Sequence, residues 1–200
     1  MKQDVKEIST ALNALSDLVQ YKVISVDMEW VVEKNSNDRI IGPKEVALVQ
    51  IGYVDDEDKV NSLLIHTKRF VRKQGKRVLP DRLEALLTRA DIYIIGFNVS
   101  ADLEKIGRDF DVESIRSVVQ KNRPNVINLG MYARKRDIVT NRGAGMAEVA
   151  QVMKGLVLDK GSREDRYSDW EKLPLSTRQV SIVSTLLRFY QSSLQLNQLT

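Results

Sequence analysis

The chain has 200 residues, of which 31 are Lys or Arg and 27 are Asp or Glu, with 42% hydrophobic residues, no cysteine and a single histidine. This composition predicts one globular domain over residues 1–200 and excludes disulfides, thiol nucleophiles and zinc sites built from Cys or from several His, so any metal ion must be bound by carboxylates. The formal net charge of +4 permits a polyanionic partner, and the lack of a secretory pattern or of an apolar run of roughly 20 residues predicts an intracellular protein without a membrane partner.

The first part of the chain shows one helical pattern followed by strand patterns. Apolar residues three or four apart predict an amphipathic helix over residues 5–19. Runs rich in β-branched residues predict strands over residues 23–30, 46–53 and 62–66, with an acidic turn over residues 55–58. We expect these strands to form a meander.

The middle of the chain predicts a helix, a strand and a second helix. The helix is expected over residues 83–90 and the strand over residues 92–96. Asn98 or Ser100 is placed to cap the second helix, which carries Asp102 in its first turn.

The C-terminal part is mostly helical in its pattern. Helices are predicted over residues 146–154 and from Ser176 onward, joined by a polar loop through Trp170. No internal repeat or low-complexity linker interrupts the chain. The alternation of strands and helices therefore predicts one mixed α/β domain.

The most informative local feature is the pair Asp27 and Glu29, near the end of a predicted buried strand. Strand alternation directs both side chains to the same face. Two like charges held close together are unfavourable unless a cation neutralises them, and ligation by oxygen alone suits Mg²⁺ or Mn²⁺. Taken alone, such a pair is more typical of a solvated strand end. A third acid, Asp102, follows at the start of a helix beyond another strand, and this combination favours a metal site.

Several segments match, in order and spacing, a known set of motifs. These segments are residues 23–30, 46–52 and 95–106 and, toward the C-terminus, Ser168-Asp169-Trp170, Pro174-Leu175-Ser176 and Gln179. They resemble, respectively, the first motif, the strand that follows it, the second motif and the approach to the third motif of the DEDD, or DnaQ-like, 3′–5′ exonuclease superfamily, in the branch of Werner-type proteins and ribonuclease D. The resemblance runs from residue 5 to residue 190. It implies an α/β, ribonuclease H-like/DnaQ-like exonuclease fold, with a mixed, largely antiparallel central sheet flanked by helices.

The resemblance also implies a reaction, which is hydrolysis by two divalent ions, Mg²⁺ or Mn²⁺, held by four carboxylates. By position, Asp27, Glu29 and Asp102 match three of these acids as catalytic and metal-binding residues.

The third motif departs from the family's pattern. In this branch a Tyr that orients the attacking water and the fourth Asp follow the Gln of the last helix, at positions that correspond here to Ile182 and Leu186. No Asp or Glu occurs from Lys172 to Thr200 that replaces the missing acid. Ile182 and Leu186 belong to one apolar helix face, which we expect to pack over the former metal site or to face a partner chain. The remaining acids are therefore interpreted as an incomplete or vestigial set that binds one Mg²⁺ or Mn²⁺ ion or none.

The densest group of basic residues follows the third predicted strand. It comprises Lys68, Arg69, Arg72, Lys73, Lys76 and Arg77. Such a run is either a solvated connection between a strand and a helix or a loop that tracks the phosphates of a nucleic acid, and the sequence leaves both open. Trp30 and Trp170 are interpreted as core residues rather than as platforms for base stacking, and His66 as a half-buried structural residue.

The sequence thus predicts an exonuclease-fold domain that binds nucleic acid, single-stranded RNA in particular, or a protein partner, with its catalysis lost or strongly reduced. One alternative is an active metal-dependent 3′–5′ exonuclease that uses Asp27, Glu29 and Asp102. The other is a protein-interaction scaffold, for example a homodimer, which merely inherits the nuclease cleft.

Overall fold

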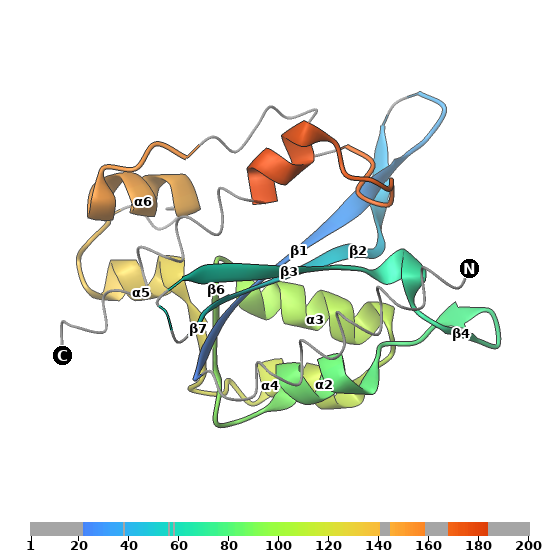
Figure 1. Ribbon diagram of the computed structural model, residues 1–200, viewed down its shortest axis with the longest axis horizontal. Helices are drawn as coiled ribbons and strands as arrows, with labels where there is room; N and C mark the ends of the chain where they lie inside the picture. Colours follow the sequence, from blue (N-terminus) through green and yellow to red (C-terminus); the bar gives the residue numbers. More distant parts are fainter. Residues whose placement is uncertain are drawn as a thin grey trace.

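A computed structural model describes residues 22–37, 39–55, 57, 59–140, 145–158 and 168–183 of the chain. The helix predicted over residues 5–19 lies outside the described residues, as does Leu186. The described residues form a layered α/β fold around one central sheet (Figure 1). Among their helices, none combines the length and the apolar character needed to cross a membrane.

The central sheet has five strands in the order β3-β2-β1-β6-β7. Their bounds are Val23–Lys34 for β1, Ile40–Val54 for β2, Val60–His66 for β3, Tyr93–Gly96 for β6 and Val126–Asn128 for β7. The long pairings of β2 with β1 and with β3 are antiparallel, which confirms the predicted meander. The shorter pairings of β6 with β1 and with β7 are parallel, so the sheet is mixed and largely antiparallel, as predicted.

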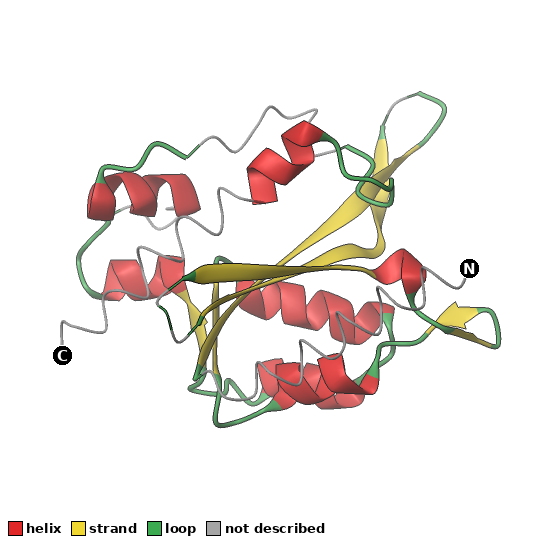
Figure 2. Ribbon diagram, in the orientation of Figure 1, coloured by secondary structure: helices red, strands yellow, loops and turns green. Residues whose placement is uncertain are grey.

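Helices flank the sheet on both faces (Figure 2). One face is covered by α2 (Asp81–Thr88), α3 (Val99–Asp109) and α4 (Glu113–Gln120). Toward the other face lie α5 (Leu129–Lys135), α6 (Met146–Lys154) and a helical segment over residues 177–183. A short 3₁₀ turn, η2 (Thr67–Arg69), and a separate hairpin of β4 (Arg72–Lys73) and β5 (Lys76–Arg77) follow β3 (Figure 1).

The core lies between the sheet and the layer of α2, α3 and α4. Ile24, Val26 and Met28 of β1 are buried there against Leu83 and Leu103 of the helices. Burying such apolar side chains contributes roughly 1.5–3 kcal/mol each. Because a slip of one residue would turn this apolar set to the other face, core packing determines the register of β1.

The remaining predicted elements agree with the structure in place, though not in every detail. The helix predicted over residues 146–154 is α6, and the strand and helix predicted on either side of residue 97 are β6 and α3. Asn98 is the N-cap of α3, in a left-handed conformation with φ 60°, but its side chain makes no capping hydrogen bond. The sequence does not predict α4, β7 or α5, since β7 has only three residues and α5 only seven, too few for a clear periodic pattern.

Gly96 ends β6 at the point where the chain turns toward α3. A Cβ atom at this position would lie 2.6 Å from the main-chain oxygen of Val26 on β1 and 2.9 Å from the Cβ atom of Val99. Neither atom belongs to the end of a flexible side chain that moves aside easily. Only glycine therefore allows β6 to pass this close to β1, and the close approach places the start of α3 beside the strand that carries Asp27.

We expect Gly96→Ala to destabilise the fold by about 1–3 kcal/mol, because the added methyl group overpacks the backbone of β1. Urea denaturation followed by circular dichroism measures the change in the free energy of unfolding. Gly42→Ala is the matched control, since a Cβ atom at Gly42 meets no atom within 4 Å. Equal stability of Gly96→Ala and the wild type would contradict this close approach.

Candidate functional site

The candidate site begins on β1. Ser25, Asp27 and Glu29 alternate with the core residues, so their side chains leave the sheet on the face opposite α2, α3 and α4. In the antiparallel pair with β2, Asp27 lies across from Gln50 and Glu29 lies across from Leu48. The structure thus agrees with the predicted arrangement of both acids on one face.

The third acid comes from the first turn of α3. The helix begins soon after β6, which is the parallel neighbour of β1. Asp102 is only 5% exposed, and its Oδ2 atom has no hydrogen-bond partner among the described residues. A buried carboxylate oxygen without a partner is unfavourable unless a proton, a cation or a ligand donor reaches it.

The three carboxylates repel one another. Burial, together with the negative charges of Asp27 and Asp102, raises the pKa of Glu29 from 4.5 to about 9. Burial, together with the charge of Asp27, raises the pKa of Asp102 from 3.8 to about 8. Each of the three acids thus lies close enough to the other two for their charges to interact. In the metal-free protein, Glu29 and Asp102 therefore favour their protonated forms near neutral pH.

The chemistry of these side chains fits a hard divalent cation such as Mg²⁺ or Mn²⁺, because they bring carboxylate oxygen atoms together, those of Asp102 buried and those of Asp27 and Glu29 partly buried. Their arrangement in the structure does not by itself form a complete metal site. Within the described ranges, no group of three or more His, Asp or Glu side chains is arranged so that it could hold a metal ion. An ion bound at Asp27, Glu29 and Asp102 therefore needs a further oxygen ligand or a movement of these side chains.

The acids occupy a polar gap between two apolar clusters on the same face of the sheet. At one end of the gap, Val23 packs against a cluster that contains Ile95 and residues of α6. At the other end, Val31 packs against a second cluster. The buried members of this second cluster are Ala47, Leu48, Trp170, Ile182 and Val183. Ile182 is thus buried in the same apolar cluster as Leu48, the cross-strand neighbour of Glu29.

Gln179 holds the start of the last described helix. Its Oε1 atom accepts a hydrogen bond from the Ser176 main-chain N at 2.9 Å, and the Ser176 Oγ atom accepts one from the Gln179 N at 3.2 Å, which together form a capping box. Its Nε2 atom donates to Ser168 Oγ and to the main-chain oxygen of Asp169, each at 3.1 Å. The helix is thereby tied to the segment of Trp170, a fully buried side chain that belongs to the core, as predicted.

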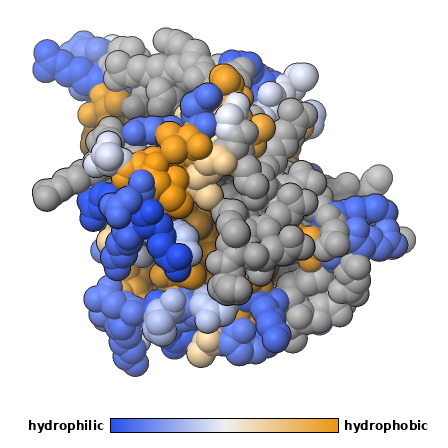
Figure 3. All heavy atoms as spheres, turned by 90° about the vertical axis from the view of Figure 1, so that its left-hand side faces the viewer, coloured by the Kyte–Doolittle hydropathy of each residue, from blue (hydrophilic) through white to orange (hydrophobic). Residues whose placement is uncertain are grey.

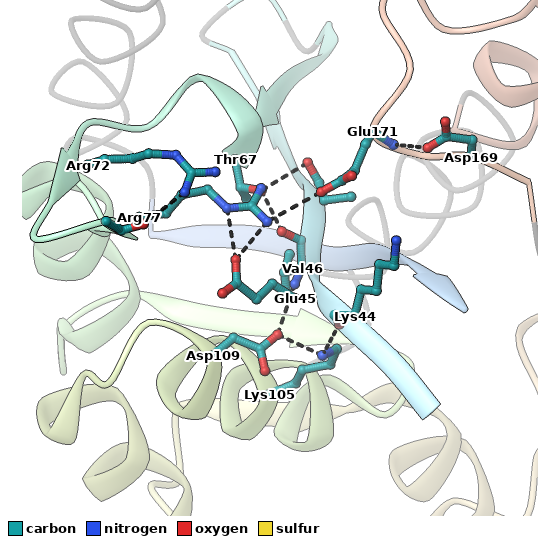
Figure 4. A network of polar contacts seen from close by, with 12 residues as sticks. Lys44, Glu45, Val46, Thr67, Arg72, Arg77, Lys105, Asp109, Asp169 and Glu171 are labelled. Carbon is teal, nitrogen blue, oxygen red and sulfur yellow. Dashed lines mark hydrogen bonds and ion pairs between the residues drawn. The ribbon is translucent and has the colours of Figure 1, made fainter. Parts of the chain in front are cut away.

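Arg77 is the buried member of the basic run. Its side chain is only 9% exposed, and its Nη2 atom lies 2.6 Å from Glu45 Oε2 and 3.3 Å from Glu171 Oε1 (Figure 4). Its Nη1 atom donates to Thr67 Oγ1 at 3.1 Å. Arg77 therefore belongs to an ion-pair network that joins β5 to β2 and to the segment before the last helix, and it does not present its charge to solvent.

The other basic residues of the run lie on η2 and on the β4–β5 hairpin. Lys68, Arg72, Lys73 and Lys76 are exposed, whereas Arg69 is partly buried. The exposed members form the basic hairpin surface, defined here as Lys68, Arg72, Lys73 and Lys76. This surface presents positive charge to solvent, which is the property that a phosphate-tracking loop requires.

Three further polar side chains, Lys105, His66 and Gln50, are buried or half-buried. Lys105 on α3 lies 2.6 Å from Asp109 and 5.2 Å from the centroid of the Trp30 ring, so both Lys105 and Trp30 serve packing. His66 is half-buried, as predicted, and burial together with Arg69 lowers its pKa. Gln50 lies in a predicted strand, yet only its position across from Asp27 marks it as part of the site.

Comparison with known proteins identifies relatives in sequence. No protein-family model matches the chain. It is 25% identical over 159 residues to a 3′–5′ exonuclease of Drosophila ananassae, a match that covers 78% of this chain and 38% of that protein. A 3′–5′ exonuclease of Drosophila persimilis is 27% identical over 158 residues, with the same coverage. The chain thus spans about two fifths of the length of the curated relatives it matches.

Solved structures share the fold. RNase D of Escherichia coli matches with a TM-score of 0.66 at 17% identity, covering 94% of this chain and 41% of that chain. The EXO domain of Nibbler from Aedes aegypti matches with a TM-score of 0.64 at 20% identity, covering 96% of this chain and 87% of that chain. The mixed sheet with flanking helices is therefore a DnaQ-like, ribonuclease H-like exonuclease fold, which confirms the predicted fold class.

Glu29→Gln tests the electrostatics of the site through the stability of the metal-free protein. Because the pKa of Glu29 is raised from 4.5 to about 9, the folded protein keeps a proton in this interval that the unfolded chain releases. The stability that protonated Glu29 contributes is complete below pH 4.5 and is lost as the pH rises toward 9. Glutamine does not ionise, so we expect Glu29→Gln to raise the melting temperature at about pH 8 by at least about 2–4 °C, and to change it little at about pH 5.

Thermal unfolding in the presence of a chelator measures this difference. Glu33→Gln is the control, since Glu33 is an exposed acid on the same strand. Identical melting temperatures for Glu29→Gln and the wild type at both pH values would show that Glu29 is solvated and not buried among the other acids.

Proposed function

We propose that this chain is a 3′–5′ exonuclease-fold domain that binds single-stranded RNA and whose catalysis is lost or strongly reduced. The exonuclease fold is the part on which the sequence relatives and the solved structures agree. The loss of catalysis is argued from the third motif. The basic hairpin surface and the fold shared with Escherichia coli RNase D support RNA as the ligand.

The burial of Ile182 is the observation that carries this proposal. The resemblance implies a water-orienting Tyr at this position, but Ile182 is 8% exposed and packs in a cluster with Trp170 and Leu48. An aliphatic side chain neither orients a water molecule nor binds a cation. Since no Asp or Glu follows Glu171 in the sequence, the last helix also lacks an acid that replaces the fourth metal ligand.

Asp27, Glu29 and Asp102 are the residues that would hold a divalent cation. When bound, such an ion would stabilise negative charge on a phosphate group and lower the pKa of a water molecule. In the metal-free protein, Glu29 and Asp102 favour their protonated forms near neutral pH, which limits the repulsion among the three acids. Their presence is the observation that favours the alternative of an active, metal-dependent 3′–5′ exonuclease.

Two observations support RNA as the ligand. The basic hairpin surface exposes four cationic side chains on a chain of net charge +4, and phosphate neutralisation by such groups drives binding to single strands. Escherichia coli RNase D, which shares the fold, is an exoribonuclease involved in structured RNA processing. For this chain we propose binding of RNA but not its hydrolysis.

A protein-interaction scaffold is the second candidate function. Exposed hydrophobic side chains gather on α5, on α6 and just after α6, namely Met131, Tyr132, Val152 and Val157. Figure 3 shows the side of the molecule where α5 and α6 lie, and an apolar patch covers part of it. Exposed apolar patches on soluble domains often mark contacts with other proteins, or between copies of one chain.

We expect at most trace release of nucleotides from the 3′ end of single-stranded RNA or DNA in the presence of Mg²⁺ or Mn²⁺. The missing Tyr and the missing acid together remove several kcal/mol of transition-state stabilisation, which lowers the rate at least about a thousandfold. Gel analysis of a 5′-labelled strand measures the trimming. Trimming that a chelator abolishes, and that disappears in Asp27→Ala, would establish the active-enzyme alternative instead.

The affinity for single-stranded RNA should fall as salt rises, with a slope of log affinity against log salt of about 0.7 per phosphate neutralised. Replacing Arg72, Lys73 and Lys76 together by Glu should flatten this slope and weaken binding, while folding survives because the three side chains are exposed. Arg77 stays unchanged in this variant because it is buried in ion pairs. Filter-binding titrations measure both quantities.

A second triple variant controls for net charge. Arg82, Arg108 and Lys121 are exposed on or next to α2, α3 and α4 and are not part of the basic hairpin surface, so their replacement by Glu changes the charge equally but should leave the slope unchanged. If the wild type retains no RNA even at low salt, the RNA proposal fails and the scaffold becomes the better account.

A further inference from the structure

Gln50 lies on β2 at the centre of the polar gap. Its register partner on β1 is Asp27, and directly opposed residues have Cβ atoms about 4.5–5.5 Å apart. Its side chain is buried, with only 4% of the residue exposed. Neither its Nε2 nor its Oε1 atom has a hydrogen-bond partner among the residues that the structure describes. A buried amide with both its donor and its acceptor unsatisfied is unfavourable.

Gln179 is a second buried amide side chain, and its hydrogen bonds offer a comparison with Gln50. It is 3% exposed, which is as buried as Gln50, yet its Oε1 accepts one hydrogen bond and its Nε2 donates two. The contrast indicates that the partner of Gln50 is a group that the described part of the chain does not supply.

The neighbours of Gln50 narrow the chemistry of that group. Asp27 lies directly across the strand pair, and Asp27 interacts with both Glu29 and Asp102. The Oδ2 atom of Asp102 is also buried without a partner in the described structure. An anionic ligand offers no donor to the Asp102 Oδ2 and Gln50 Oε1 atoms, which are both acceptors. A cation satisfies carboxylate oxygens and an amide oxygen at the same time, and Mg²⁺ and related hard ions accept both kinds of ligand.

We propose that Gln50 is a ligand of a divalent cation held at Asp27 and Asp102, where its Oε1 atom supplies a neutral oxygen in a site that lacks the fourth acid. Its Nε2 atom then donates to a carboxylate oxygen or to a phosphate oxygen of a bound strand. This inference rests on the proposed exonuclease-type site and adds to it Gln50, which lies in the strand that follows the first motif and is not one of the acids that the resemblance implies. It also adds an oxygen ligand to a site where, among the described residues, no three acidic or His side chains are arranged to hold a metal ion by themselves.

Mn²⁺ alone is the probe, titrated into the metal-free full chain and followed by calorimetry and by the electron paramagnetic resonance signal of free Mn²⁺. Gln50→Met keeps the length of the side chain but removes the oxygen, so we expect its Mn²⁺ affinity to fall at least about tenfold. Gln50→Glu replaces the amide oxygen by a carboxylate, so it should bind Mn²⁺ more tightly than the wild type. Both readouts are independent of nuclease activity.

Gln179→Met is the matched control, because it makes the same chemical change at an equally buried amide. It should lower the melting temperature by breaking the capping box and leave the Mn²⁺ affinity unchanged. Gln50→Met should do the reverse and melt, in chelator, no lower than the wild type. If Gln50→Met does not fold, the tighter binding expected of Gln50→Glu decides the question alone.

Wild-type affinity in both Gln50 variants, or a wild type that binds no Mn²⁺, overturns the inference. Salt-dependent RNA binding measured in chelator reports on the proposed function separately. RNA binding without any Mn²⁺ binding would leave the proposed function standing and refute the role of Gln50. Mn²⁺ binding that depends on Gln50, without RNA binding, would support the inference and refute the RNA proposal.

Discussion

The alternation of side chains along β1 is the constraint on which the rest of the structure depends. One face of the strand is apolar and lies under α2, α3 and α4, so the strand cannot slip by one residue without carrying Asp27 and Glu29 into that core. The same alternation holds the acids together on the other face, whether or not they still serve catalysis. Burial of Glu29, together with the charges of Asp27 and Asp102, raises its pKa. Core packing therefore maintains an arrangement that is unfavourable in charge.

The second face of the sheet depends on the segment that carries the third motif. Trp170 and Ile182 pack with Leu48, while Gln179 holds the helix to the turn before it. Arg77 joins this segment to the hairpin through Glu171, which is the neighbour of Trp170 in the chain. Buried ion pairs contribute little net stability, so the main effect of this ion pair is to hold two segments in position. It links the basic hairpin surface to the segment that packs beside the acids.

A shared fold does not by itself carry an activity, since function resides in a few side chains placed on the fold. The curated 3′–5′ exonucleases are only 25% and 27% identical to this chain and extend well beyond it, and the solved structures that match are less similar in sequence still. The proposals about function therefore depend on Ile182 and Gln50 more than on overall similarity. Ile182 stands where the resemblance implies a water-orienting Tyr, and Gln50 is the residue that we propose as a metal ligand.

Local periodicity and motif order, which are properties of the sequence alone, determined the meander, the placement of α3 and the pairing of Asp27 with Glu29 on one face. The sequence alone also shows that the last helix lacks an acid, because this depends only on which residues are present. Only the tertiary structure decided that Arg77 is buried in ion pairs apart from its exposed neighbours, and that Gln50 lies unsatisfied across from Asp27. Both facts depend on which distant residues come to lie side by side, and that is set by strand register and packing, not by spacing along the chain.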